Sequence, residues 1–148
     1  MPADFQLTWE LGGHGWADCT VSDRDSSTVI TASNITTAPE DLLAATARLA
    51  LGATESRAQF NAEPTIARWI LYREGSDIWI RILELPGDVH DNRGTEIWSS
   101  QQPLITVVRA VVRCFDSVAA RYRESAYRGK WGEHFPRQEL EVLRRQLP

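Results

Sequence analysis

The side chains best suited to chemistry lie in a short segment past the middle of the chain. Asp88, His90, Asp91 and Asn92 fall within five consecutive positions. Carboxylates beside an imidazole can bind a divalent ion or act as acid and base. Their spacing fits no calcium-binding loop, and no glycine-rich phosphate motif accompanies them. We interpret the segment as a solvated loop, and as the first place to look if the protein is an enzyme, because functional residues gather on loops.

A second group of reactive types surrounds the first expected turn: His14, Asp18 and Cys19. Histidine and cysteine bind metals, and a cysteine beside a histidine can be a nucleophile. However, Asp18 and Cys19 are adjacent and would point to opposite faces of a strand, and the sequence identifies no third and fourth ligand. We therefore expect a turn histidine and a small core cysteine here, with no metal and no cofactor.

Arginine and tryptophan are interleaved between positions 65 and 85. Two interpretations stay open: a charged binding surface with tryptophan anchors, or cross-strand ion pairs that cover a sheet and are worth under ~1 kcal/mol each. Together with the acidic loop, this stretch supplies the candidate binding residues, which are Trp69, Trp79, Arg68, Arg81, Asp88, His90 and Asp91.

Aromatic residues also gather near the end of the chain, at Tyr127, Trp131 and Phe135. Such residues beside glycine suit an interface, and they equally suit a hydrophobic plug that closes one end of the core. We expect the plug.

The elements that must position these groups centre on residues 65–85, where two runs rich in β-branched and aromatic residues flank the turn Glu74-Gly75-Ser76. This pattern predicts a β-hairpin. Apolar bulk on both faces of its second strand predicts that the hairpin is central and covered on both sides.

Alternation and helical spacing place the remaining elements. A helix is expected to begin at a Thr37 cap and to end at Gly52. A second begins at Pro103, and a glycine-bracketed connector over 129–132 leads to a third, opened by Pro136. Strands are expected at 5–11, 16–23, 28–33, 57–61, 65–73, 77–85 and 95–100. The expected fold is α+β: one domain over 1–148, with a single antiparallel sheet of about five to seven strands and two to three helices packed mainly on one face.

Composition narrows the classes of partner. The 148 residues carry a net charge of −4 with no long basic run, which disfavours nucleic acid. No segment approaches the ~20 apolar residues of a membrane span, and we expect no signal peptide at the start. Two distant cysteines form no disulfide framework, so the expected location is the cytoplasm.

Three runs carry a resemblance to known proteins. Two of the runs lie in the hairpin, Arg68-Trp69-Ile70-Leu71-Tyr72-Arg73 and Ile78-Trp79-Ile80-Arg81-Ile82-Leu83-Glu84, and the third is the closing run Tyr127-Arg128-Gly129-Lys130-Trp131-Gly132-Glu133-His134-Phe135-Pro136. Small uncharacterised actinobacterial proteins contain similar runs. Some of these proteins resemble immunity proteins of bacterial toxin systems, which block a toxin by binding it. The resemblance implies the same order of elements and assigns no site residue.

The sequence thus favours a non-catalytic, immunity-like bacterial protein that binds another protein, either a toxin-like partner or a second copy of itself. The alternative is a small-ligand-binding or enzyme domain, whose pocket would lie between sheet and helices with the 86–94 loop at its mouth.

Overall fold

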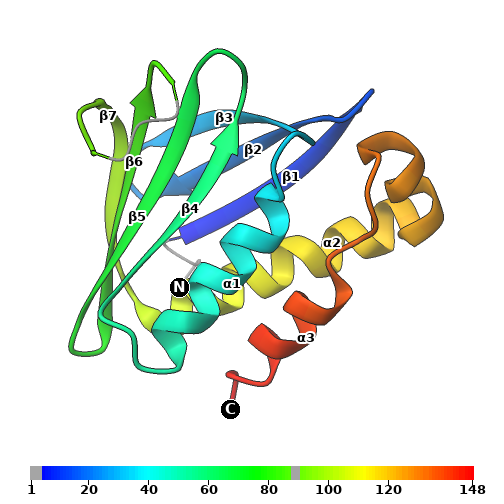
Figure 1. Ribbon diagram of the computed structural model, residues 1–148. Coiled ribbons are helices and arrows are strands. Elements are labelled where there is room, and N and C mark those ends of the chain that lie inside the picture. Colours follow the sequence, from blue (N-terminus) through cyan, green and yellow to red (C-terminus); the bar gives the residue numbers. More distant parts are fainter. Residues whose placement is uncertain (1–4, 88–90) are drawn as a thin grey trace.

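Seven strands and three helices make up residues 5–87 and 91–148, the part of the chain that this computed structural model describes (Figure 1). The first sheet contains β1 (Phe5–Gly13), β2 (Trp16–Asp23) and β3 (Ser27–Ser33), and the second contains β4 (Glu55–Asn61), β5 (Ile66–Glu74), β6 (Asp77–Leu85) and β7 (Thr95–Pro103). The helices are α1 (Ala38–Ala50), α2 (Leu104–Trp131) and α3 (Arg137–Arg144).

The α+β class is confirmed, and the single sheet is wrong. The strands form two antiparallel sheets, of order β1-β2-β3 and β4-β5-β6-β7. Helix α1 separates β3 from β4 in the chain, so no hairpin joins the two ladders. In Figure 1 all three helices lie on the same side of both sheets. Each of the two sheets can bury one face against the helices around a shared core. A single sheet of seven strands would twist too far from one edge to the other to do the same.

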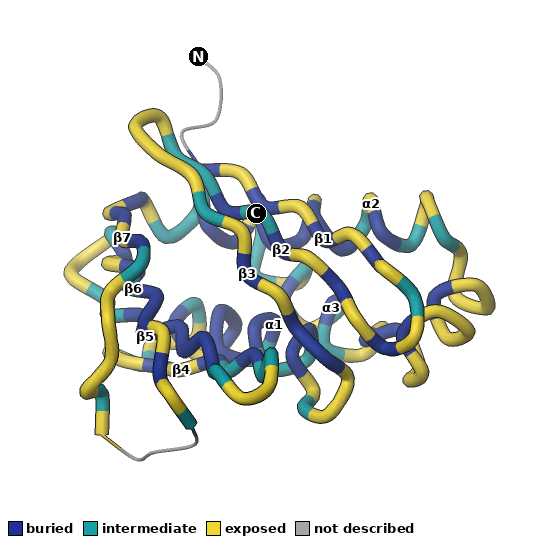
Figure 2. Tube along the Cα trace, turned by 90° about the horizontal axis from the view of Figure 1, so that it is seen from above, coloured by how far each residue is buried: buried dark blue, intermediate teal, exposed yellow. Residues whose placement is uncertain are grey.

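The central hairpin is confirmed. Strands β5 and β6 occupy the two middle positions of the second sheet, and their pairing runs from Glu74 opposite Asp77 to Ile66 opposite Leu85. Gly75 turns the chain at φ +60°, a conformation that glycine adopts without steric cost. The alternation expected for the first three strands is also present, and Figure 2 shows buried and exposed residues following one another along β1 and β2.

One buried cluster draws on both sheets and all three helices. At its centre the ring of Trp9 on β1 lies 5.8 Å from Phe60 on β4, 5.9 Å from Phe115 and 5.4 Å from Trp131 on α2, measured between centroids. Trp9 therefore joins the two sheets to the long helix, and its edge-on contacts with Phe60 and Trp131 add about 1 kcal/mol each to area burial.

The start of α1 follows the sequence rules in part. Thr37 is its N-cap residue, but the Thr37 hydroxyl donates to the carboxylate of Asp41 at 2.9 Å instead of capping a backbone N–H. Glu40 and Asp41 stand in the first turn, where negative charge interacts favourably with the helix dipole.

The connector expected over 129–132 is wrong. Helix α2 continues through Gly129 to Trp131 and ends at Gly132, whose φ of +99° closes it. The only non-helical residue inside the described helix is Arg123, at φ 58° and ψ 159°. A glycine in a helix interior costs about 1 kcal/mol relative to alanine, which the burial of Tyr127 and Trp131 on either side of it offsets.

No helix in the described part of the chain combines the length and the apolar character needed to cross a membrane.

Candidate protein-binding surface

The register of the β5–β6 hairpin separates the two tryptophans that the sequence grouped together. Trp79 stands opposite Tyr72, whereas Trp69 stands opposite Ile82. Paired residues share a face of the sheet and neighbours along a strand alternate. Trp79 and Tyr72 therefore lie on the outer face of the second sheet, and Trp69 lies on the inner face.

Trp69 belongs to the core. It is 1% exposed, and its ring centroid lies 5.7 Å from that of Phe60. A side chain in this position cannot contact a partner without the core being opened, so the structure removes Trp69 from the candidate surface.

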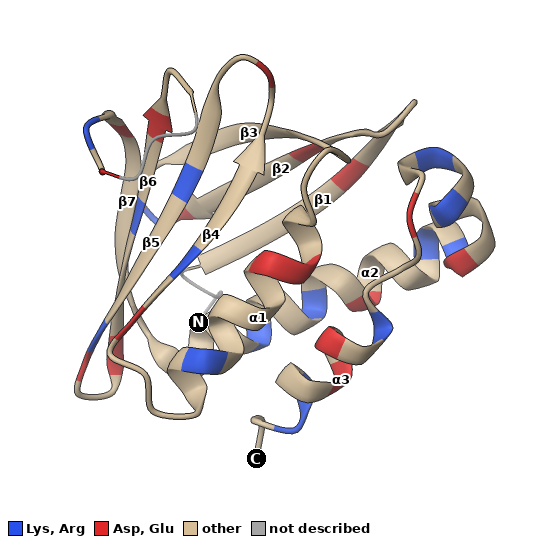
Figure 3. Ribbon diagram, viewed as in Figure 1, with Lys and Arg blue, Asp and Glu red and all other residues tan. Residues whose placement is uncertain are grey.

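Trp79 lies at the centre of an exposed surface that combines aromatic and charged groups. The tryptophan is 38% exposed, and so the expectation that both faces of β6 are covered is wrong here. With it on the outer face are Tyr72, Arg81, Arg57 and Glu96. We call these five residues the Trp79 surface. Figure 3 marks both basic and acidic residues along the strands of this sheet.

Electrostatic pairing orders one side of this surface. Arg81 Nε donates to Glu96 Oε1 at 2.7 Å, an ion pair of which both members are about 40% exposed. The hydrogen bond from Arg81 to Glu96 raises the pKa of the Arg81 guanidinium. Beside the pair is a shallow depression of about 440 Å³, whose lining includes Tyr72, Trp79 and Arg81. An aromatic anchor beside a hollow and a fixed guanidinium is the composition typical of binding hot spots.

Arg68 shares the outer face but is not exposed. It is 5% exposed. Its Nη1 donates to the backbone carbonyl of Asp91 at 2.9 Å and to Asn92 Oδ1 at 3.1 Å, and its Nη2 donates to Gln59 Oε1 at 3.1 Å. Arg68 therefore holds the loop after β6 against the sheet, which is a structural role.

The same loop covers a small apolar cluster. Ile66, Ile70, Leu83 and Leu85 are all at most 4% exposed but lie outside the main core. A Cβ built on Gly94 would stand 2.7 Å from Leu85 Cδ2, so the loop packs closely on this half of the outer face. The other half carries the Trp79 surface, where Trp79 is 38% exposed.

The acidic loop itself is only partly described. Asp88 and His90 lie outside the described residues. Asp91 is in the described part, with a side chain that is 54% exposed and 3.5 Å from Arg93 Nε. Its contact with Arg68 places this part of the loop on the face of the second sheet that points away from the helices. A cavity does lie between a sheet and a helix, but it is lined by residues of β1 and α2 and not by this loop.

The remaining sequence candidates are separated or buried. His14 is an exposed turn residue at φ 57°, Asp18 accepts a hydrogen bond from Thr31 at 3.0 Å, and Cys19 is fully buried, which raises the pKa of its thiol. In the two described segments, no group of three or more His, Cys, Asp or Glu residues is placed to hold a metal ion.

The aromatic group near the chain end closes the core, as expected. Tyr127 and Trp131 are at most 1% exposed, and the ring of Phe135 lies 5.3 Å from that of Tyr127 at an interplanar angle of 83°.

Three members of the Trp79 surface, Tyr72, Arg57 and Glu96, were not singled out from the sequence. The place of Glu96 depends on the irregular register between β6 and β7. For Tyr72 the signal was available: a two-residue turn at Gly75 and Ser76 pairs residues whose numbers sum to 151, and so puts Tyr72 opposite Trp79. For Arg57 no signal existed, because its place depends on how β4 pairs with β5.

Comparison with known proteins gives a likeness in fold. No protein-family profile and no curated protein matches the sequence. Among solved structures, a chain of the CdiA-CT/CdiI toxin and immunity complex from Enterobacter cloacae is similar, with a TM-score of 0.51 and 12% sequence identity over 76% of this chain and 99% of that chain. At that identity the likeness shows that the two chains share an arrangement of strands and helices.

Proposed function

We infer that this protein is a non-catalytic module that binds another protein, and that it acts as an immunity protein by docking a toxin through the Trp79 surface. The single observation that carries this proposal is an exposed tryptophan, flanked by Tyr72 and the ordered Arg81, on the exposed half of the outer face of the second sheet.

The chemistry of the surface supports a protein partner. Tryptophan, tyrosine and arginine are the residue types most enriched at binding hot spots. They sit on paired β-strands, whose backbone does not need to be ordered on binding, so little conformational entropy is lost. The Arg81–Glu96 pair offers one fixed positive and one fixed negative group for recognition.

The fold likeness supports the immunity role. The similar chain comes from a complex of a toxin with its immunity protein, and the sequence runs described above are similar to those of small actinobacterial proteins, some of which resemble immunity proteins. A bacterial cytoplasm is the proposed site of action, because Cys19 and Cys114 are both buried and unpaired, as in a reducing compartment.

The test is a co-expression assay. Each reading frame that flanks this gene is expressed in a host bacterium alone and together with this chain. We expect one of them to stop growth, and growth to return when this chain is present. The complex is then isolated by size-exclusion chromatography with light scattering, which also reports any self-association of the chain.

Variants locate the surface. The double variant Trp79→Ala/Arg81→Glu is expected to abolish rescue. Val29→Ala, which alters an apolar side chain that is 59% exposed on the other sheet, is expected to retain it. If no flanking frame is neutralised, the immunity role is wrong, and if the double variant still rescues growth, the Trp79 surface is not the docking site.

A further inference from the structure

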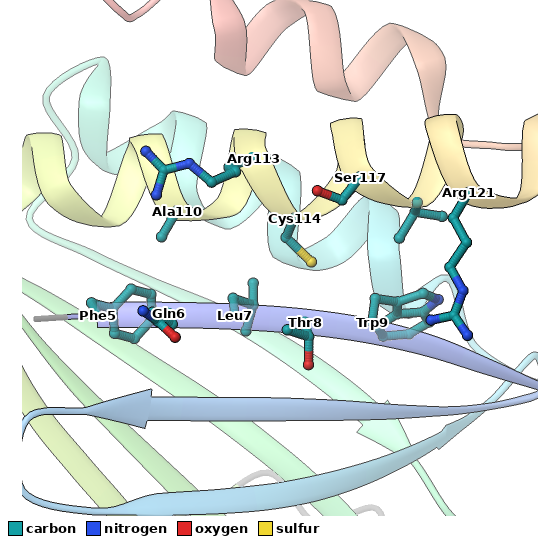
Figure 4. Close-up of a pocket in the computed structure, with 11 residues that line it drawn as sticks. Phe5, Gln6, Leu7, Thr8, Trp9, Ala110, Arg113, Cys114, Ser117 and Arg121 are labelled. Atoms are coloured by element: carbon teal, nitrogen blue, oxygen red, sulfur yellow. The ribbon is translucent and has the colours of Figure 1, made fainter. Parts of the chain in front are cut away.

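A groove runs between the edge of β1 and helix α2, on a different sheet from the Trp79 surface. Its volume is about 320 Å³, and it is lined by residues 5–9 of β1 and by α2 residues that include Arg113, Ser117 and Arg121. Figure 4 shows the helix running along the strand, with Cys114 directed at β1 and the side chain of Arg121 beside Trp9. Five consecutive strand residues point alternately to both faces of a sheet, so a cavity that touches all five lies along the strand's edge.

This edge has backbone groups available for pairing. Among the described residues, β1 is the outer strand of the first sheet and pairs with β2 alone. The N–H of Leu11 points away from β2, because it donates to the hydroxyl of Tyr122 on α2 at 3.0 Å. N–H and C=O groups in a strand change sides at every residue. The amides of Leu7 and Trp9 therefore point into the groove, whereas those of Gln6 and Thr8 point toward β2.

An uncapped strand edge of this kind is a template for another strand. Tyr122 closes the edge at Leu11, which leaves the part from Phe5 to Trp9 beside the groove. β1 contains no proline and no lysine, the residues with which proteins most often protect such an edge.

The groove carries positive charge on a protein of net negative charge. Among the described residues that line it are Arg113 and Arg121, and no aspartate or glutamate. Outside the lining, the carboxylate of Glu10 lies 3.2 Å from Arg121 Nη1 in a pair that is 63% and 59% exposed. An exposed pair is worth under ~1 kcal/mol, so an incoming carboxylate can replace it.

The spacing of the arginines matches an extended chain. Arg113 and Arg121 are eight residues apart on α2 and both line the groove, a separation of about 12 Å along the helix axis at 1.5 Å per residue. Two side chains four residues apart in a strand share a face and are about 13 Å apart. A segment with acidic residues at positions i and i+4 can therefore place one carboxylate at each arginine.

We propose that β1 and α2 form a second binding site, which takes an extended acidic segment of a partner protein as an added strand. Backbone hydrogen bonds to Leu7 and Trp9 supply affinity, and the two arginines select acidic side chains at i and i+4. The site goes beyond the proposed immunity role and does not depend on it. A second copy of this chain fits less well, because its β1 carries a single acid, Glu10, and both copies have a charge of −4.

The test uses a fluorescein-labelled peptide, Thr-Glu-Val-Thr-Val-Glu-Thr, and the full chain. We expect saturable binding by fluorescence anisotropy. We also expect slower amide hydrogen exchange at Leu7 and Trp9 when the peptide is present, with no change at Gln6 and Thr8, which already face β2.

Four comparisons isolate the mechanism. A peptide N-methylated at alternate residues and a peptide with both glutamates replaced by lysine should each fail to bind. The double variant Arg113→Glu/Arg121→Glu should bind the parent peptide about tenfold more weakly or worse. Arg128→Glu alters an exposed arginine of the same helix outside the groove lining, and it should bind as the wild type does.

Three results would overturn the site. Binding that survives N-methylation, or no binding of the parent peptide at all, would exclude strand addition. Tighter binding of an eight-nucleotide oligothymidine than of the peptide would assign the arginines to phosphate. The variant Trp79→Ala leaves this groove intact, so its peptide affinity reports on this site independently of the immunity assay.

Discussion

The hydroxyl of Tyr122 accepts a hydrogen bond from the backbone N–H of Leu11 at 3.0 Å, and so joins two residues that are 111 positions apart. It supplies what a neighbouring strand would otherwise supply at the edge of the first sheet. A side chain of α2 thus occupies the edge of β1 at Leu11. The part of the edge from Phe5 to Trp9 stays beside the groove.

Tyr122→Phe is expected to remove this bond and nothing else. The free energy of unfolding should fall by about 1 kcal/mol, and the amide of Leu11 should exchange its hydrogen faster, as measured by NMR. Tyr127→Phe is the matched control. The Tyr127 hydroxyl is buried without a hydrogen-bond partner among the described residues, so its removal should cost little or should stabilise the fold. Equal losses in both variants would contradict the assigned role of Tyr122.

The two hairpin tryptophans should respond to truncation in opposite ways. Trp69→Ala removes a ring that is 1% exposed and is expected to cost about 3–5 kcal/mol. Trp79→Ala, at a residue that is 38% exposed, should cost under about 1 kcal/mol. Urea unfolding followed by far-ultraviolet circular dichroism measures both. A large loss at Trp79 would mean that its face of the sheet is covered.

Much of the fold was readable because the signals are local. Alternation located the strands, and turn chemistry located the central hairpin, for which Gly75 provides the positive φ. The division into two sheets could not be predicted from the sequence. Alternation indicates which residues face the core, but it does not indicate which strands are hydrogen-bonded neighbours. Strand β7 also runs to Pro103, beyond the expected end near residue 100, since its Ser and Gln residues give no β signal.

The candidate surface was partly readable for the same reason. Trp79 and Arg81 lie where a partner can reach them, but Arg68 does not, because burial on the outer face depends on a loop that folds back from beyond β6. The groove beside β1 was missed entirely. Arg113 and Arg121 are two exposed helix residues in the sequence, and only the packing of α2 along the strand brings them to its edge.

The ion pair between α2 and α3 should make stability depend on pH. Arg144 binds both oxygens of Asp116, at 2.8 and 2.5 Å, and this hydrogen bonding lowers the pKa of Asp116. A carboxylate with a lowered folded-state pKa stabilises the fold above its unfolded pKa, and that contribution is lost as the pH falls through the folded value.

Asp116→Asn is therefore expected to unfold more easily than the wild type at about pH 7, with a gap that closes at acid pH. Both partners are about 40% exposed, so solvent screening limits the gap to under about 1 kcal/mol. Urea midpoints of the two proteins across the pH range measure it. A gap that persists well below the folded-state pKa of Asp116 would show that the asparagine perturbs packing instead.

Alanine substitution at the two glycines near the end of α2 should change the stability in opposite directions. Gly132 has φ +99°, and a Cβ there would stand 2.6 Å from Asn34 Nδ2, so Gly132→Ala should cost at least about 1 kcal/mol. Gly129 lies inside the helix with open space around its missing Cβ, and Gly129→Ala should stabilise by about 0.5–1 kcal/mol. Thermal melts compare the two. Stabilisation by both substitutions would place the helix end elsewhere.

The non-helical backbone at Arg123 separates the last turns of α2 from the earlier ones. The last turns are expected to move with a different part of the molecule. Beyond Arg123, the carbonyl of Lys130 accepts from the N–H of Gly15 at 3.0 Å, and the carbonyl of Trp131 accepts from Asn34 Nδ2 at 2.8 Å. Gly15 directly precedes β2 and Asn34 directly follows β3, so both bonds join the last turns of the helix to the same end of the β2–β3 pair. The last turns of α2 are thus hydrogen-bonded to the first sheet. We expect them to separate from the core and to return to it together with that end of the sheet, while the turns of α2 before Arg123 stay packed.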